Sequence, residues 1–341
     1  MSQRTRYFMI GSALVIVLGL GVGAVAYYNG NLPLTGRGGP AEFSYLPADV
    51  NGVAYANVTT IMNSQFTQRL RQVLPTGDEK TKLQAELGID IERDIDSVVG
   101  GTVGFGPDEH GLVLVRGRFN TGHLEALAVQ HGGTAEEYKG KKLITFENSP
   151  YAHAGGGAGD QVGHGAVAFL EGGLLAFGDR VAIERAIDAN ATRQNVTGNA
   201  DLMKLVGEVQ AGSDAWVVGN FEAISRSKTL PTEVATHLPA VQWFAVSTNF
   251  NGGVNGTVRA EARDEKAAEE LKAVVNGALA AGRLVSGQDK RIEAMLNALQ
   301  VSGMGKSVTI SFTVPPEILD IINGVAAAKH LSDGSGTKVK K

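Results

Sequence analysis

An uncharged apolar segment near the N-terminus, residues 7–28, constrains this chain more than any other feature. Its 22 residues are rich in Val, Leu, Ile, Ala and Gly, and Arg4 and Arg6 precede it. A helix needs about 20 apolar residues to cross a bilayer, whereas the apolar core of a signal peptide has about 7 to 15. Length therefore predicts one retained transmembrane anchor. The small residues of Ala24-Val25-Ala26 leave cleavage by signal peptidase open as the alternative.

The charges around this segment predict its orientation. No Lys or Arg follows it until Arg37, so the positive-inside bias places the N-terminus in the cytoplasm and the body outside the inner membrane, periplasmic or extracellular. Residues 29–45 are rich in Gly and Pro, which is typical of a tether. We therefore expect contact with membrane lipid through residues 7–28. Gly19 and Gly23 form a GxxxG pair, through which two spans could dimerise.

Composition excludes several functional classes. The chain contains no Cys, which removes thiol nucleophiles, disulfides, iron–sulfur clusters and cysteine-based zinc sites. Its formal net charge is -4, and the basic residues gather only in the predicted disordered tail, residues 329–341. An exported body without a basic patch does not suit nucleic-acid binding. Hydrophobic residues make up 43% of the chain, which is enough for a globular core.

Similarity between the two halves predicts a tandem duplication. Three pairs of segments match in the same order: residues 55–64 with 218–227, residues 118–120 with 263–264, and residues 177–188 with 312–323. The offset falls from 163 to 135 residues, so the first copy carries insertions. We expect one unit at residues 46–193 and a second at residues 213–328, joined by a connecting helix within residues 194–212.

Side-chain alternation indicates the fold class. In residues 256–263, Val258 and Ala260 share one face of a predicted strand, while Arg259 and Glu261 share the other. A sheet with one wet face is typical of antiparallel strands that carry helices on the opposite face. The sequence therefore predicts an α+β fold of duplicated antiparallel-sheet units with helices on one face, preceded by one transmembrane helix.

Helix signals complete this plan. Met62, Phe66 and Leu70 recur at helical spacing and predict one helix after the first strand. Asp264 is predicted to cap a helix whose apolar stripe includes Leu271, Val274, Val275 and Ala278.

Three segments of the exported region also carry a resemblance. They are YLPAD at residues 45–49, GIDIERDID at residues 88–96 and AVAFLEGGLLAFG at residues 166–178. In these, and in the apolar span that precedes them, the chain resembles a family of uncharacterised bacterial membrane-anchored exported proteins, grouped as a domain of unknown function. The resemblance covers most of the exported region. It implies tandem α+β units behind an anchor, and it implies no activity and no site residue.

Two motifs imitate ligand sites. GMGKS at residues 303–307 looks like the end of a phosphate-binding loop, but Val301 occupies the position of its first Gly and a strand is predicted to follow, so we interpret it as a turn. Four alternating acidic residues imitate a calcium loop: Asp90, Glu92, Asp94 and Asp96. The Gly and the bidentate Glu of that loop are missing. We therefore predict that Asp90 caps a short helix, with Ile91 and Ile95 turned inward.

The Gly-rich segment at residues 151–165, YAHAGGGAGDQVGHG, is the most unusual stretch. His153, Asp160 and His164 could in principle hold a metal ion with an open coordination position. Ordering so many Gly residues costs about 1–2 kcal/mol each, which favours a long insertion without a site. His131 precedes a Gly pair at the end of a predicted helix, where a histidine often serves the helix C-terminus.

Two functions remain open. The first is a membrane-anchored extracytoplasmic binding or structural module of the bacterial envelope, with an envelope protein as partner and with no catalytic residue, cofactor or metal. The alternative is an exported metal-dependent hydrolase that uses the Gly-rich segment at residues 151–165. A pocket that brings a histidine and a carboxylate within hydrogen-bond reach would favour the alternative. An exposed apolar patch would favour the first.

Overall fold

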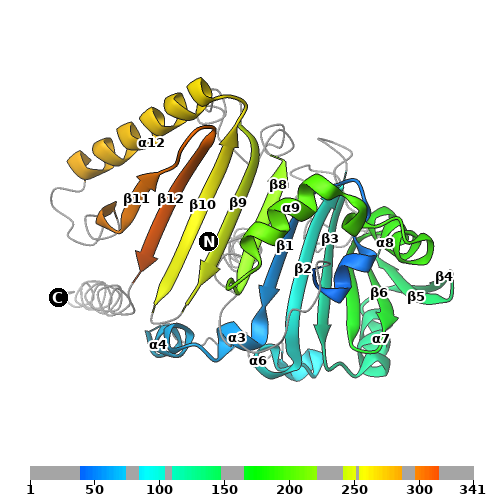
Figure 1. Cartoon of the computed structure of the whole chain (residues 1–341). Coiled ribbons are helices and arrows are strands. Elements are labelled where there is room, and N and C mark those ends of the chain that lie inside the picture. The colour runs from blue at the N-terminus through cyan, green and yellow to red at the C-terminus, as the bar shows by residue number, and fades with distance from the viewer. Residues whose placement is uncertain are drawn as a thin grey trace, which may run out of the picture.

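The computed structural model describes residues 39–73, 84–103, 110–146, 165–220, 241–250, 253–285 and 296–314. Its strands form one antiparallel 12-stranded sheet, and helices pack against it, so the predicted α+β class is confirmed (Figure 1). The strands are β1 (Val50–Asn57), β2 (Ile95–Val103), β3 (His110–Gly117), β4 (Thr134–Tyr138), β5 (Lys141–Phe146), β6 (Gly165–Glu171), β7 (Leu174–Asp179), β8 (Ala215–Asn220), β9 (Val241–Asn249), β10 (Val254–Ala262), β11 (Leu299–Ser302) and β12 (Ser307–Val314). The helices are η1 (Ala41–Tyr45), α3 (Val58–Met62), α4 (Gln65–Val73), α6 (Ile91–Asp94), α7 (Thr121–Gln130), α8 (Arg180–Thr192), η3 (Val196–Gly198), α9 (Ala200–Val209) and α12 (Glu265–Val285).

The first strand of the chain and a strand from its second half pair near the middle of the sheet. The order across the sheet is β11-β12-β10-β9-β8-β1-β2-β3-β7-β6-β5-β4. The central pair is β1 and β8, which run antiparallel with Val53 opposite Val218 and Ala56 opposite Ala215. Residues far apart in the sequence therefore share one continuous sheet.

One face of the sheet, here called the core face, carries the largest cluster of buried side chains. Along β3, β2, β1 and β8 it presents Leu114, Val99, Tyr55 and Trp216 in register. Helices η1, α8 and α9 cover it with apolar side chains such as Phe43, Ile183 and Leu202, all of which are fully buried. Phe43 meets the Trp216 ring edge-on at 6.0 Å, and Tyr55 stacks on the same ring at 5.7 Å. This packing holds the centre of the sheet to its helix layer.

Beyond β8 the core face becomes polar. Continuing the register from Trp216, the next positions on β9, β10, β12 and β11 are Ser247, Thr257, Ser311 and Gln300. Arg259 lies on this polar side and pairs with Glu208 of α9. The opposite side of β10 is apolar, and Ala260 and Ala262 pack there with Leu271 of α12. The predicted wet face of this strand is confirmed.

Helices consequently lie on both faces of the sheet, which corrects the prediction of one covered face. α8 covers the core face over β3, β6 and β7, and α9 covers it over β8 and β9, whereas α12 covers the opposite face over β10 and β12. The physical reason is the change of polarity along the core-face register, because a helix is stabilised only where it buries apolar surface. The helices therefore lie on the face of the sheet that is apolar in each part.

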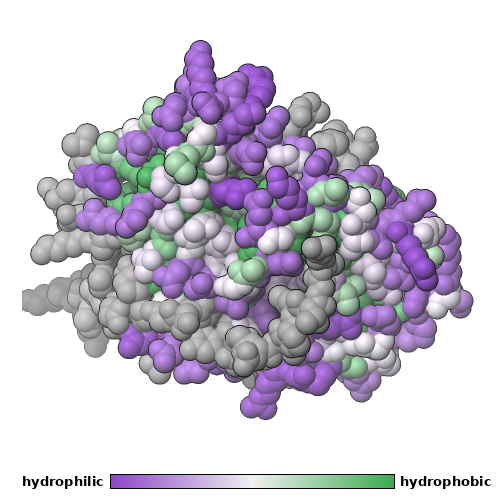
Figure 2. All heavy atoms as spheres, viewed as in Figure 1, coloured by the Kyte–Doolittle hydropathy of each residue, from purple (hydrophilic) through white to green (hydrophobic). Residues whose placement is uncertain are grey.

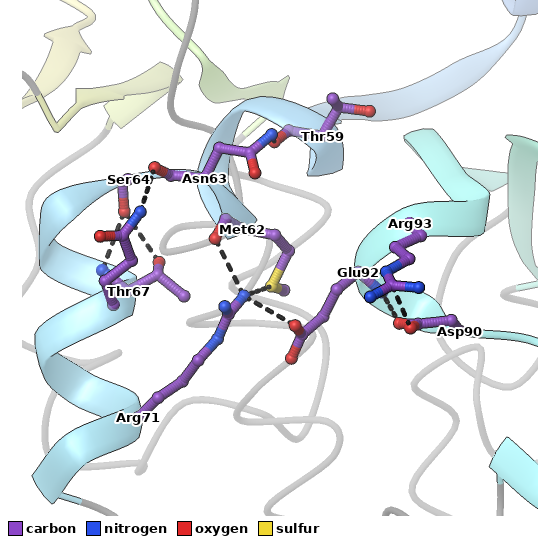
Figure 3. A network of polar contacts seen from close by, with 10 residues as sticks. Thr59, Met62, Asn63, Ser64, Thr67, Arg71, Asp90, Glu92 and Arg93 are labelled. Atoms are coloured by element: carbon purple, nitrogen blue, oxygen red, sulfur yellow. Dashed lines mark hydrogen bonds and ion pairs between the residues drawn. The ribbon is translucent and has the colours of Figure 1, made fainter.

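The helix predicted around Met62 is divided into two. α3 ends at Met62, and Ser64 then begins α4 by accepting a hydrogen bond from the Thr67 amide at 2.8 Å. The Ser64 hydroxyl also donates to Thr67 Oγ1 at 2.9 Å, and both side chains are buried (Figure 3). A Ser with this geometry is a preferred N-cap, so it stops one helix and starts the next.

A cation fastens α4 to its neighbours. Arg71 donates to the Met62 carbonyl at 2.9 Å and pairs with Glu92 of α6 at 3.0 Å (Figure 3).

Among the helices in the part of the chain that the structure describes, none is long and apolar enough to cross a membrane. The predicted span at residues 7–28 lies outside the described residues, as do most of the tether and the tail.

Candidate functional site

A continuous apolar row crosses all 12 strands on the face opposite the core face. In spatial order it consists of Ala135, Ile144, Val167, Phe177, Val113, Gly100, Ala54, Val217, Val246, Val258, Ile310 and Val301. We call the side of the sheet that carries this row the valine face. Not one position of the row is polar or charged. The sheet is therefore apolar on both faces over the first half of the chain.

Helices cover the two ends of this row. At one end Ile144 is fully buried near α7, where Glu125 of α7 pairs with Lys142 of β5 at 2.6 Å. At the other end, Val301 packs with the apolar side of α12. α3 and α4 close one end of the strands, because Ile61 and Phe66 cluster with Ala56 and Ala215. These helices form the rim of a surface whose floor is the middle of the row.

The middle of the row keeps contact with solvent. We define the central valine face as Phe177, Val113, Gly100, Ala54, Val217 and Val246 on β7, β3, β2, β1, β8 and β9. Phe177 is 38% exposed, and the other five are half-buried. On the core face of the same strands, Val99, Leu114 and Trp216 are at most 2% exposed. The side chains of the floor are thus apolar and yet partly exposed to solvent. Contiguous apolar surface of this kind is typical of interaction sites.

Hydrophilic side chains gather elsewhere on the molecule. On the side that carries α8 and α9, they surround one end of α12 and the region of β4 and β5 (Figure 2). A pocket of about 450 Å³ in that second region is lined by Ala135, Glu136, Glu137, Gly140 and Lys142. No histidine lines this pocket. Of its two carboxylates, Glu136 pairs with Arg180 at 2.8 Å, and Glu137 lies on the edge strand β4.

Buried charge marks the core face. Glu42 of η1 is 4% exposed and accepts a hydrogen bond from Arg116 of β3, which also donates to Glu171 at 3.0 Å. Burial raises the pKa of Tyr55 to about 12, and the nearby Glu42 and Asp214 carboxylates add to this. Burial alone raises the pKa of Asp214 to about 7. Tyr55 lies on the core face, and Glu42 and Asp214 are close enough to act on it, so these charges belong to the core and not to the valine face.

Two histidine–carboxylate pairs occur among the described residues. One joins His131 to Glu86 at 3.0 Å and is exposed at the C-terminal end of α7. The other joins β3 to β7. His110 Nδ1 lies 2.7 Å from Asp179 Oδ2, while Asp179 Oδ1 accepts the Ala182 amide and so caps α8. A carboxylate in this position can orient an imidazole, as in general-base pairs. Asp179 also pairs in register with Gly165, the last residue of the Gly-rich segment and the only one of its residues that the structure describes.

The acidic run at residues 90–96 folds as a cap. Asp90 accepts the Glu92 amide at 3.0 Å, which confirms the predicted capping role. The other carboxylates are engaged as well: Asp94 accepts the Asp90 amide at 2.8 Å, and Asp96 pairs with Arg118 at 3.1 Å. The inward placement of Ile91 was wrong, because its side chain is 38% exposed. α6 has only four residues, too few to form a buried stripe.

The remaining sequence motifs resolve into turns and caps. Residues 303–307 form the turn between β11 and β12, with Gly303 and Gly305 at positive φ and Ser307 donating to the Met304 carbonyl. His131 ends α7 by donating its amide to the Leu127 carbonyl at 3.0 Å. The turn interpretation is confirmed. His131 does lie at the C-cap of α7, but its imidazole pairs with Glu86 at 3.0 Å. His153, Asp160 and His164 lie outside the described residues.

Sequence reasoning missed the valine face. Each strand taken singly shows only a short run such as VVGG or LVLV, in which both alternating sets are apolar. Such a run indicates a strand with two apolar sides, but it does not tell which strands are neighbours. Runs with two apolar sides are present in β2 and β3. Only the register between strands shows that their outer side chains belong to one surface.

These features define a class: an α+β protein built on one large antiparallel sheet with an apolar, partly accessible face. Among solved structures, the chain is similar to crystal form III of TP0453, with a TM-score of 0.46 and 8% identity over 83% of this chain and 97% of that one. Crystal form I of TP0453 gives 0.43 and 9% over 83% and 97%. Comparison with family models and with the sequences of curated proteins finds no match.

Proposed function

We propose that this chain is a membrane-anchored extracytoplasmic binding module of the bacterial envelope, without catalysis, and that the valine face is its binding surface. The observation that carries the proposal is the apolar row whose centre stays accessible, with Phe177 38% exposed. Contiguous exposed apolar surface marks interaction sites on proteins. The span at residues 7–28 would hold the module at the inner membrane, where an envelope protein is the expected partner.

The strand order supports the tandem layout within this proposal. Outward from the centre, β1-β2-β3-β7-β6 and β8-β9-β10-β12-β11 follow the same pattern. α7 follows β3, and α12 follows β10, at matching points. The hairpin of β4 and β5 is then the insertion of the first unit. Two units that share a sheet through β1 and β8 would each contribute half of the central valine face.

The proposal is tested by photo-crosslinking of the full-length chain in intact cells. A photoreactive residue replaces Val113 or Val217 on the valine face, and in the control it replaces Thr313, which is exposed on the polar side of β12. We expect a discrete crosslinked species from Val113 and Val217 and none from Thr313. Equal labelling at all three positions, or none at any, would remove the binding proposal.

The hydrolase remains a second candidate because of the His110–Asp179 pair, 2.7 Å apart, at the strand end that borders the Gly-rich segment. A base needs a nucleophile or a metal-bound water to activate, and the described residues contain no group of three possible metal ligands. We therefore place binding first. Zinc-dependent cleavage of ester or amide substrates that His110→Ala abolishes would reverse this order.

A further inference from the structure

We infer that the central valine face receives an amphipathic α-helix of a partner protein. This inference rests on the proposed binding function and names the chemistry of its partner. The floor is formed by the six residues Phe177, Val113, Gly100, Ala54, Val217 and Val246, which neighbour one another across six adjacent strands. Its rim is formed by α7, α12 and the α3–α4 pair.

Continuity with the chain's own packing points to a helix. The same row that is half-buried at its centre is covered at its ends by α7 and α12. α12 turns apolar side chains toward the sheet and polar ones to water: Leu271 is buried while Glu269 and Glu270 are exposed. An occupant of the centre meets the same apolar floor and the same solvent above it, and an amphipathic helix satisfies both.

The dimensions also suit a helix. Six adjacent strands at about 4.8 Å spacing make the floor roughly 24 Å wide, and helices are about 10 Å in diameter with their side chains. One helix, or a helical hairpin, therefore fits between α7 and α12. Glycine and alanine in the middle of the floor, Gly100 and Ala54, allow a helix backbone to approach closely.

A second copy of this chain fits the surface poorly. Strands of eight residues, such as β1, are about 27 Å long, so the floor measures roughly 650 Å² before the part under α3 and α4 is subtracted. A standard interface buries about 800 Å² on each partner. Two flat faces pack about 10 Å apart, and the helices of the rim occupy that layer. A narrow element can enter where a whole sheet cannot.

Lipid chains are the other apolar occupant. An acyl chain lying on this floor would remain exposed on its outer side where the floor itself is accessible, as it is at Phe177, which is 38% exposed. Small apolar ligands bind where most of their surface is enclosed. A helix carries its own polar side and loses nothing by facing water, so the geometry favours it.

Gly100 supplies a variant that separates docking from folding. A Cβ built on Gly100 would lie 3.9 Å from its nearest neighbours, Ala54 Cβ and the Leu112 carbonyl, so a side chain enters the floor without displacing the sheet. Gly100→Leu should keep the melting temperature of the wild type and fill the place of the helix. We expect it to reduce crosslinking from Val217 at least tenfold. Thr313→Leu is the matched control and should leave crosslinking unchanged.

The experiment identifies the crosslinked residue. The full-length chain with a photoreactive residue at Val217 is crosslinked in intact cells, and mass spectrometry locates the attachment point. A partner segment with apolar residues at i, i+3, i+4 and i+7 supports the inference, provided that Gly100→Leu suppresses the product. Attachment to lipid, to a second copy of the chain, to another segment of the same chain, or to an extended segment overturns it. Attachment to lipid, to a second copy or to an extended segment leaves the binding proposal standing. Attachment to another segment of the same chain, or an absence of any product, overturns both.

Discussion

Gly100 and Gly101 are neighbours on β2 that face opposite environments. A Cβ on Gly101 would lie 3.1 Å from Leu46 Cδ2, which is fully buried in the core, whereas a Cβ on Gly100 would have 3.9 Å to its nearest neighbours. One glycine is thus required by packing, and the other has room for a side chain. These two adjacent residues show that the core face is tightly packed and that the valine face is not.

This difference predicts unequal effects of the same substitution. Gly101→Ala should lower the free energy of unfolding by about 1–3 kcal/mol, because the added Cβ must push Leu46, which is fully buried in the core. Gly100→Ala should be neutral or stabilising by up to about 1 kcal/mol, since alanine loses less backbone entropy than glycine. Urea unfolding of both variants checks this. Equal losses would show that the two faces are equally packed.

Asp214 predicts a pH dependence. Its pKa rises from 3.8 to about 7 on folding because burial disfavours the charged form. A carboxyl with a raised folded pKa favours the folded state at low pH, and this contribution is lost as the pH rises from about 4 through 7. The loss by pH 8 is roughly 1–3 kcal/mol, since the half-buried side chain retains some hydration.

Asp214→Asn removes this titration. The variant should be more stable than the wild type at pH 8 and should lose most of that advantage near pH 4, close to the unfolded pKa of 3.8, where folded Asp214 is protonated and the unfolded chain is only partly ionised. Melting temperatures measured between pH 4 and pH 8 give the comparison. A difference between the two proteins that does not change with pH would contradict the assignment.

Arg116 predicts a strong coupling on the core face. Removing it by Arg116→Met leaves Glu42 buried without its cationic partner, which costs about 3–5 kcal/mol. The double variant Glu42→Gln, Arg116→Met should recover part of this loss because no buried charge remains. Denaturant unfolding of both single variants and the double variant measures the coupling. Simple additivity would mean that the pair contributes nothing.

The anchor predicts retention in membranes. Leu14→Arg and Val17→Arg should each cost about 2.5–3.5 kcal/mol in insertion, so the double variant should leave the membrane fraction. Cell fractionation and the sequence of the mature N-terminus check this. A soluble periplasmic protein beginning at Tyr27 would establish cleavage after Ala26 in place of anchoring.

The Gly-rich segment predicts the absence of a metal response. Replacing His153, Asp160 and His164 together by Ala should change stability by less than about 0.5 kcal/mol per site, as at exposed loop positions. A bound metal would instead stabilise the wild type by about 2.7 kcal/mol at a hundredfold excess over Kd. Melting temperatures with and without zinc decide. A rise confined to the wild type would favour the hydrolase.

Local signals in the sequence determined much of the secondary structure. Asp264 accepts the Ala267 amide at 2.8 Å and begins α12 as predicted, and the turn at Gly303 and Gly305 precedes a strand. Such features depend on a few neighbouring residues, so they can be read from the chain directly. The predicted stripe of α12 was only partly right, because Leu271 is buried and Val274 is 42% exposed.

The sheet itself was decided by tertiary structure. Alternation predicted that Val258 belongs to a strand, but not that it lies in one row with Val217 and Val113 across β10, β9, β8, β1, β2 and β3. Strand pairing joins residues more than 100 positions apart, and no local pattern encodes which partners meet. The sequence by itself determined where apolar side chains alternate and where helices begin. Only the register of the folded sheet decided that these side chains form two apolar faces, one filled by helices and one accessible at its centre, because packing selects among pairings that are locally equivalent.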